Sequence, residues 1–290
     1  MKPAAFEYHA PATREEAIAL LVRHGPDSKV LAGGQSLVPT MNFRLAQPAL
    51  LVDINRTSGL SGIEATEAGI RIGAMTRQRE AERSELLRER APLLHETIPF
   101  IGHVQIRNRG TMGGCLAHAD PAAELPAVML AMGGTVHLEG PSGARSLAAE
   151  DFFTGLFATA LAPDELLVAL EVPSARPGDG TAFMELSRRH GDYALAGVAA
   201  YVHVAAGICT EARVALLGVG DGPVFSSSVE STLAGQRPTR EAIRAAAAGV
   251  ARDIDPVGDI HASATYRRHL GSVLTRRALE RAFSRAGDAR

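Results

Sequence analysis

The hydrophobic and polar positions of the first 54 residues predict a small α/β unit. Residues 6–11 have an extended pattern, and Thr13-Arg-Glu-Glu16 is a capping box placed just before an apolar helical face. This helix should stop at Gly25-Pro26, and the apolar runs at residues 29–32 and 49–54 have the length of buried strands. The order strand, helix, strand, loop, strand fits one compact α/β unit.

The middle of the chain has a pattern that is typical of antiparallel strands. Ile70 and Ile72 alternate with polar residues, which predicts a hairpin formed by residues 62–65 and 68–73. Thr76 is expected to cap the next helix. Further along, the pattern predicts a helix, a hairpin and a long strand, at residues 125–132, 135–147 and 165–172.

A turn-rich stretch at residues 174–180 is the best domain boundary in the chain. The pattern beyond it predicts strands and then helices, at residues 181–186, 194–206, 211–219, 240–251 and 264–281. Strands followed by helices indicate an α+β domain with helices gathered at one side of an antiparallel sheet. The predicted domains are residues 1–57, 58–175 and 180–290.

Composition and charge narrow the class of protein. The 290 residues carry a formal net charge of -2 and no Trp, so neither nucleic acid nor a membrane surface is indicated as a partner. The two cysteines, Cys115 and Cys209, are too few for an iron–sulfur cluster or a Cys-rich zinc site. Glu7 lies where a signal peptide would be apolar, and no run is long enough to span a membrane, so we expect a cytoplasmic protein.

Two glycine-containing stretches carry the candidate chemistry. Residues 31–37 contain Gly33-Gly34 with a serine, and residues 105–124 contain Gly113-Gly114 with a threonine. Glycines let backbone N–H groups converge on an anion, so together these stretches could hold a pyrophosphate from two sides. One Gly-Gly pair alone is more often a tight turn. Asp120-Pro121 has the pattern of a helix start.

Other motifs give weaker signals. The sequence has no P-loop and no Gly-x-Ser-x-Gly elbow, and Gly218-Val-Gly220 lacks the third glycine of a dinucleotide-binding turn. His118-x-Asp120 could ligate a metal but has no further ligand tied to it, so neither a metal site nor a catalytic residue is predicted. Tyr193, after a Gly-Asp turn, either reaches a ligand or is a buried anchor of a domain interface.

The order and spacing of four segments resemble the FAD-binding medium subunit of the molybdenum hydroxylases. This family includes carbon monoxide dehydrogenase and xanthine dehydrogenase-like enzymes. The segments are Ala32-Gly-Gly-Gln-Ser36, Arg107 to Glu124, Arg188 to Ala196, and Asp259 to Leu270. The resemblance implies an α+β fold with a two-part FAD-binding region of the vanillyl-alcohol-oxidase (PCMH) type to about residue 175, then an α+β C-terminal domain.

The resemblance also implies a cofactor, FAD, and the residues that bind it. The segments at Ala32–Ser36 and Thr111–Cys115 would hold the pyrophosphate and ribityl chain, with Glu124 near the flavin, Leu161 supporting it and Tyr193 covering it. The full set of implied cofactor-binding residues is Ala32, Gly33, Gly34, Gln35, Ser36, Leu37, Arg107, Thr111, Gly113, Gly114, Cys115, Ala117, Asp120, Glu124, Leu161 and Tyr193.

The implied partners are a large molybdenum-cofactor subunit and a small [2Fe-2S] subunit, in a dimer of heterotrimers. Electrons would pass from the clusters to FAD and on to an external acceptor. The chain departs from many relatives at Gln35 and Cys115, and it has no lysine in residues 182–186. Two alternatives stay open, a free-standing FAD-dependent oxidase or dehydrogenase and a non-catalytic FAD-binding module. The substrate would be chosen by the large subunit and cannot be read from this chain.

Overall fold

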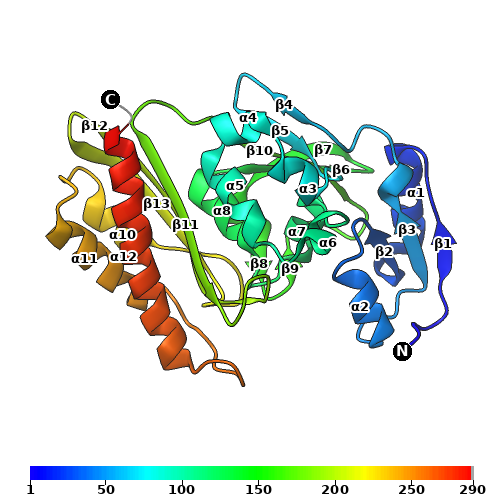
Figure 1. Ribbon diagram of the computed structural model, residues 1–290. Coiled ribbons are helices and arrows are strands. Elements are labelled where there is room, and N and C mark those ends of the chain that lie inside the picture. Colours follow the sequence, from blue (N-terminus) through cyan, green and yellow to red (C-terminus); the bar gives the residue numbers. More distant parts are fainter. Residues whose placement is uncertain (289–290) are drawn as a thin grey trace.

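The computed structural model describes residues 1–288, in which three main sheets follow one another along the chain (Figure 1). The first sheet is parallel, in the order β1-β3-β2. Its helix α1 begins after Thr13, whose Oγ1 accepts a hydrogen bond from the Glu16 amide at 3.2 Å, so the capping box is confirmed. This unit comprises β1 (Glu7–His9), α1 (Arg14–His24), β2 (Ser28–Leu31), α2 (Leu37–Asn42) and β3 (Leu50–Asp53).

The second unit is built on an antiparallel sheet in the order β4-β5-β10-β6-β7, which includes the predicted hairpin, β4 with β5. Strand β10 lies at the centre, and α7 and α8 belong to the core that covers the sheet. Its strands are β4 (Ile63–Ala65), β5 (Ile70–Gly73), β6 (Thr135–Gly140), β7 (Gly143–Ala148) and β10 (Leu166–Val172), with a ribbon of β8 (Phe153–Gly155) and β9 (Ala158–Thr159). Its helices are α3 (Gln78–Glu82), α4 (Glu85–Arg90), α5 (Pro92–Thr97), α6 (Val104–Arg107), α7 (Met112–His118), α8 (Glu124–Met132) and α9 (Ala149–Phe152).

The predicted helix cap at Thr76 is wrong. Its hydroxyl oxygen lies 3.0 Å from both the amide nitrogen and the carbonyl oxygen of Gly62, so it ties two segments of the chain together. Helix α3 begins one residue later, with Arg77 at the N-cap position and no side-chain cap. The hydroxyl is engaged by a tertiary contact that the local sequence does not reveal.

The second glycine-containing stretch is also different from the expected loop. Residues from Met112 onward form a helix, α7, despite the glycines at 113 and 114. Gly113 is buried, and a Cβ at position 113 would lie 2.5 Å from the Ala74 Cβ. Close packing of the helix on the neighbouring segment therefore requires this glycine.

The C-terminal unit is an antiparallel sheet in the order β11-β12-β13-β14 with helices along one face. The long helix α12 packs along β11 and β12 (Figure 1). The unit comprises β11 (Asp179–Ser187), β12 (Ala194–Ala205), β13 (Ile208–Leu217), β14 (Val224–Phe225), α10 (Ser227–Leu233), α11 (Arg240–Gly249) and α12 (Ala264–Asp288). Helix α12 therefore continues beyond the predicted end at residue 281.

The other face of the C-terminal sheet joins the core of the second unit. Side chains alternate along β11, so Ala182 belongs to the core beneath α12 whereas Phe183 packs in the core of the second unit. The rings of Phe183 and Phe100 lie 5.1 Å apart. This shared core fixes the C-terminal sheet against α5 and α8.

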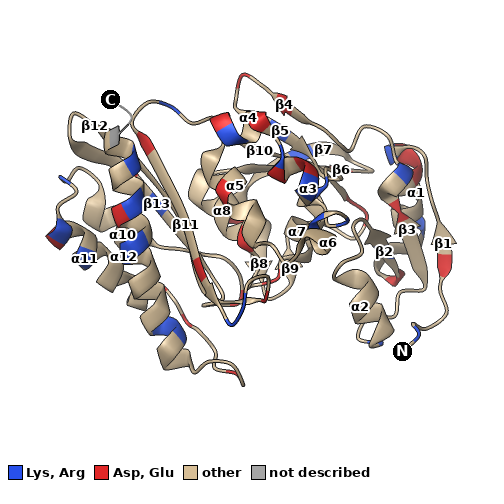
Figure 2. Ribbon diagram, in the orientation of Figure 1, with Lys and Arg blue, Asp and Glu red and all other residues tan. Residues whose placement is uncertain are grey.

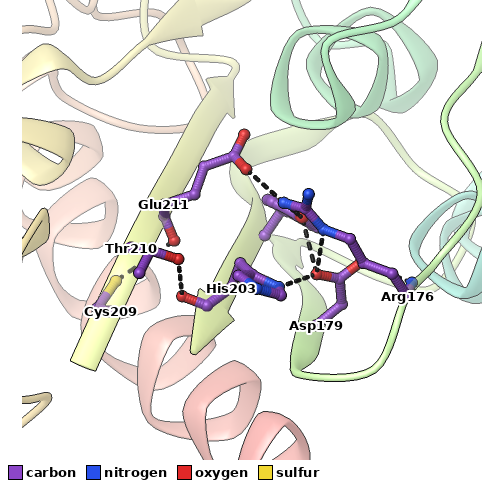
Figure 3. A network of polar contacts seen from close by, with 7 residues as sticks. Arg176, Asp179, His203, Cys209, Thr210 and Glu211 are labelled. Carbon is purple, nitrogen blue, oxygen red and sulfur yellow. Dashed lines mark hydrogen bonds and ion pairs between the residues drawn. The ribbon is translucent and has the colours of Figure 1, made fainter. Parts of the chain in front are cut away.

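A polar network fastens the start of the C-terminal unit, far from the glycine-containing stretches (Figures 1 and 3). Asp179 accepts a hydrogen bond from Tyr201 at 2.8 Å, and its Oδ1 lies 2.7 Å from His203 Nδ1. Arg176 bonds Asp179 and reaches Glu211 at 2.9 Å. The network ties the linker before β11 to β12 and β13.

Charged residues of both signs are interspersed along all three units (Figure 2). Their mixture agrees with the small net charge of -2. Within the described residues, no helix is both long enough and apolar enough to cross a membrane.

Candidate functional site

The first glycine-containing loop presents a row of unused backbone donors. Within residues 1–288, no protein acceptor bonds the amides of Gly33, Gly34, Gln35 or Ser36, which lie between β2 and α2. Gly34 has a φ of 72°, a conformation that favours glycine. The Gln35 side chain donates to the Gly33 carbonyl at 3.1 Å and so steadies the turn. Successive free N–H groups of this kind form a concave site for an anion.

The first loop lies directly against the second stretch. A Cβ at Gly33 would lie 2.5 Å from the Arg109 carbonyl oxygen and 2.8 Å from the Gly110 Cα. A Cβ at Gly114 would lie 2.5 Å from Thr111 Oγ1 and 3.4 Å from the Ala32 Cβ. The two stretches predicted from sequence are therefore brought together, and their contact depends on glycine.

The amides of the second stretch are already used inside the protein. Met112 donates to the Thr76 carbonyl at 3.0 Å, and Gly113 donates to the Ala74 carbonyl at 2.8 Å. Thr111 is the N-cap of α7, and its Oγ1 accepts from the Gly114 amide at 3.1 Å. The second stretch therefore forms a rigid wall behind the first loop, whereas the sequence suggested two equivalent loops.

Two residues that sequence reasoning missed join the loops. The Arg77 guanidinium donates to the Arg109 carbonyl and to Asn55 Oδ1, each at 2.6 Å. Asn55 in turn donates to the Ala32 carbonyl at 2.9 Å. Asn55 could have been proposed from the sequence, because it is a polar residue just after the predicted strand at residues 49–54. The residues around Arg77 give no comparable indication. This clamp connects the first unit to the second around the candidate anion site.

The guanidinium of Arg107, a residue predicted to bind the cofactor, is engaged inside the protein. The side chain is buried, and its guanidinium bonds both carboxylate oxygens of Glu82, at 2.9 and 3.2 Å. It also donates to the carbonyls of Ile101 and Gly102, both at 3.0 Å. These acceptors occupy the guanidinium, so Arg107 supports the segment before α6.

A buried carboxyl group closes the other end of the second stretch. Glu124 is the first residue of α8 and is 8% exposed. Burial, with Asp120 nearby, raises the pKa of Glu124 to about 7. Burial also raises the pKa of the Cys115 thiol, with Glu124 and Asp120 adding to the effect. A protonated thiol is a poor nucleophile and metal ligand, so Cys115 is a packing residue.

Asp120 shapes the turn between α7 and α8. Its Oδ1 accepts from the Ala122 amide at 2.9 Å, and the Pro121 carbonyl accepts from the Gly218 amide at 2.8 Å. Asp120-Pro121 therefore lies in the turn, and α8 begins three residues after Pro121, at Glu124. The turn brings the C-terminal sheet next to the candidate site.

Tyr193 is 69% exposed, so it is not a buried anchor. Its turn packs on the second unit, where a Cβ at Gly191 would lie 2.5 Å from the His103 ring. Partial desolvation, followed by the charges of Asp120 and Glu124, raises the pKa of Tyr193. The tyrosine therefore stands beside the acidic end of the site with its ring available for contact.

The other predicted cofactor-binding residues, Leu37, Ala117 and Leu161, are apolar. Ala117 and Leu161 are half-buried and pack against the core of the second unit, and Leu37 opens α2. His118 lies 4.0 Å from an Asp120 carboxylate oxygen, and its ring centroid is 5.2 Å from that of Phe157. Among residues 1–288, no three His, Cys, Asp or Glu side chains are grouped to hold a metal ion.

Two family profiles match the chain. The FAD binding domain in molybdopterin dehydrogenase matches residues 4–175, and the CO dehydrogenase flavoprotein C-terminal domain matches residues 181–282. Together they cover both sides of the linker and nearly the whole chain.

Full-length relatives give the same result. The chain is 42% identical to the 6-hydroxypseudooxynicotine dehydrogenase complex subunit alpha of Paenarthrobacter nicotinovorans, over 99% of this chain and 97% of the relative. It is 39% identical to the carbon monoxide dehydrogenase medium chain of Hydrogenophaga pseudoflava, over 98% of this chain and 99% of the relative.

Solved structures agree in fold. A structure of carbon monoxide dehydrogenase from Hydrogenophaga pseudoflava superposes with a TM-score of 0.96 at 40% identity, covering 98% of this chain and 99% of that chain. Quinoline 2-oxidoreductase from Pseudomonas putida 86 gives a TM-score of 0.92 at 35% identity, covering 100% of this chain and 99% of that chain. The predicted fold, a two-part FAD-binding region followed by an α+β C-terminal domain, is confirmed.

Proposed function

This chain belongs to the FAD-binding medium subunits of the molybdenum hydroxylase family, and we propose that it carries electrons from a [2Fe-2S] partner subunit through FAD to an external acceptor. The observation that supports the cofactor's place is the row of free amides from Gly33 to Ser36. A diphosphate needs several donors in one concave site, and this loop supplies them without lysine.

The residues present fit FAD. The Gly33–Ser36 amides would hold the diphosphate, and the wall formed by Thr111 to Cys115 would keep the loop in shape. FAD supplies the redox chemistry when it is bound, and the protein supplies orientation, electrostatics and access. The residues proposed to line the cofactor are Ala32, Gly33, Gly34, Gln35, Ser36, Leu37, Thr111, Gly113, Gly114, Cys115, Ala117, Asp120, Glu124, Leu161 and Tyr193, with Arg107 as a support.

Different side chains of this protein have different roles around that site. The Asn55–Arg77 clamp holds the two FAD-binding units together, and Arg107 fixes the segment before α6. Leu161 offers an apolar surface, and the exposed Tyr193 can cover a flat ring or move aside to admit an acceptor. Aromatic side chains suit such contacts because their faces are apolar.

The assembly and location are further parts of the proposal. We expect a large molybdenum-cofactor subunit and a small [2Fe-2S] subunit in a dimer of heterotrimers, with the chain in the cytoplasm. The chain contains two cysteines, so cluster ligands would have to come from a partner. We also propose that residues 1–57, 58–175 and 180–290 are the domains.

An absorption spectrum of the purified chain tests the cofactor assignment. FAD is added, excess is removed by gel filtration, and the flavin band is compared with protein absorbance. We expect one FAD per chain. No retained flavin, either alone or after co-expression with the molybdenum and iron–sulfur subunits, would contradict the proposal.

A further inference from the structure

Glu185 carries a buried carboxylate oxygen without a partner. Within residues 1–288, its Oε2 is inaccessible to solvent and makes no hydrogen bond. Alternation along β11 places Glu185 on the same face as Phe183, which packs into the second unit. Gly197 is its neighbour on β12, and a Cβ at Gly197 would lie 3.1 Å from the Glu185 Cβ. The carboxyl group therefore points into the seam between the C-terminal sheet and the FAD-binding region.

Glu124 lies on the opposite side of the same seam. Gly197 pairs with Leu217 on β13, and the next residue, Gly218, donates its amide to the carbonyl of Pro121, three residues before Glu124. Glu124 begins α8, is 8% exposed, and forms no ion pair or hydrogen bond with another side chain in the described part of the chain. Arg107, whose charge lowers the pKa of Glu124, is itself ion-paired with Glu82. The other titratable groups around the two carboxyls are Cys115, Asp120 and Tyr193.

Ionising both of two carboxyl groups in one poorly solvated place is unfavourable in free energy. Burial, followed by the charge of Glu124, raises the pKa of Glu185 to about 8. Burial and Asp120 raise the pKa of Glu124 to about 7. Both carboxyl groups therefore lose their protons near neutral pH, and the charge of Glu124 makes ionisation of Glu185 harder.

We propose that Glu124 and Glu185 form an electrostatically coupled pair of carboxyl groups across the seam and act as positioning residues that set the charge beside the FAD site. The inference rests on the proposed function, because FAD is the anion that senses this charge. When a proton is present on the pair, one negative charge is removed next to Cys115 and Tyr193. When the last proton leaves, both carboxylates repel an anionic cofactor.

The dissociation constant of FAD, measured by flavin fluorescence between pH 6 and pH 9, tests the pair. We expect affinity to fall roughly tenfold as pH rises, because each carboxyl group that ionises adds a repelling charge beside the cofactor site. Glu185→Gln should reduce this fall in affinity and confine it to the lower part of the pH range, because only Glu124, whose pKa is raised to about 7, still titrates there. Glu230→Gln, in α10, is the matched control and should keep the wild-type profile. An unchanged pH profile in Glu185→Gln would overturn the proposal.

A second measurement uses the wild-type protein without FAD, so it needs neither bound cofactor nor a folded variant. Infrared spectra of the FAD-free protein should show a protonated carboxyl band at pH 6 that disappears by about pH 9. Absence of such a band at pH 6 would overturn the pair. Failure to bind FAD at any pH, with the band present, would contradict the proposed function and leave the pair supported.

Discussion

The two glycine-containing stretches differ in what they do with their backbone. The loop at Gly33–Ser36 keeps its amides free, whereas the helix that begins at Met112 has donated its first amides to the Thr76 and Ala74 carbonyls. Both contain adjacent glycines, but Gly34 allows a left-handed turn and Gly113 allows close packing. A glycine pair therefore marks a backbone that must come close to something, and only the structure shows whether that is a ligand or the protein itself.

The largest expected effect comes from Gly33→Ala, which forces the two stretches apart. The new Cβ would lie 2.5 Å from the Arg109 carbonyl oxygen, and backbone cannot yield as a side chain can. We expect FAD affinity to fall by roughly 100-fold or more, about 3 kcal/mol, measured by fluorescence titration. Gly222→Ala, where the nearest atom is 3.9 Å away, is the control and should bind normally. Wild-type affinity in Gly33→Ala would show that the contact is not needed.

A smaller effect is expected when the clamp is removed by Arg77→Met. The change leaves Asn55 Oδ1 and the Arg109 carbonyl without their donor, which should cost about 1–3 kcal/mol of unfolding free energy. FAD affinity should fall roughly tenfold, because the loops lose a shared support. Arg83→Met replaces an exposed arginine nearby and serves as the control. Equal stability and equal FAD affinity in the two variants would show that the clamp supports neither the fold nor the cofactor site.

Thr111→Ala tests the wall that residues Thr111 to Cys115 form behind the first loop. It removes the N-cap of α7, so the unfolding free energy should fall by about 1 kcal/mol in chemical denaturation. FAD affinity should change less than in Gly33→Ala, because the amides of the wall already bond protein carbonyls. Thr111→Ser keeps the hydroxyl and should restore stability. If Thr111→Ala abolished FAD binding while the protein stayed folded, the hydroxyl would be a direct ligand.

The smallest effect is expected for Tyr193→Ala. The side chain is 69% exposed and adds little to the core. The free energy of unfolding should therefore change by no more than about 0.5 kcal/mol, as is usual for surface substitutions. Flavin fluorescence of the bound cofactor should rise, because an aromatic ring that contacts flavin quenches it. Unchanged fluorescence would place Tyr193 away from the ring.

Local signals in the sequence found most elements of the fold. The capping box at Thr13 and the hairpin at residues 62–73 depend on neighbours in sequence, and both are present in the structure. Helix α7 was missed because glycines lower helix propensity, and the burial of Gly113 against Ala74 is a long-range contact. The end of α12 was placed too early because its charged last turns resemble a tail.

The two stretches that form the candidate site could be predicted from the sequence, but the contacts that each of them makes could not. Family resemblance pointed to both glycine-containing stretches, and the structure brings them together. The Arg77 clamp and the engagement of Arg107 by Glu82 depend on residues 22 to 32 positions apart, which no local pattern encodes. Burial of Glu124 and Glu185 likewise follows from the packing of two units.

Amide hydrogen exchange, followed residue by residue before and after FAD is added, tests the central contrast most directly. Without FAD, the amides of Met112 and Gly113 should already be protected, and those of Gly33 to Ser36 should exchange rapidly. With FAD, protection should appear at Gly33 to Ser36 and change little at Met112 and Gly113. New protection confined to Met112 and Gly113, with Gly33 to Ser36 still exchanging rapidly, would contradict the account.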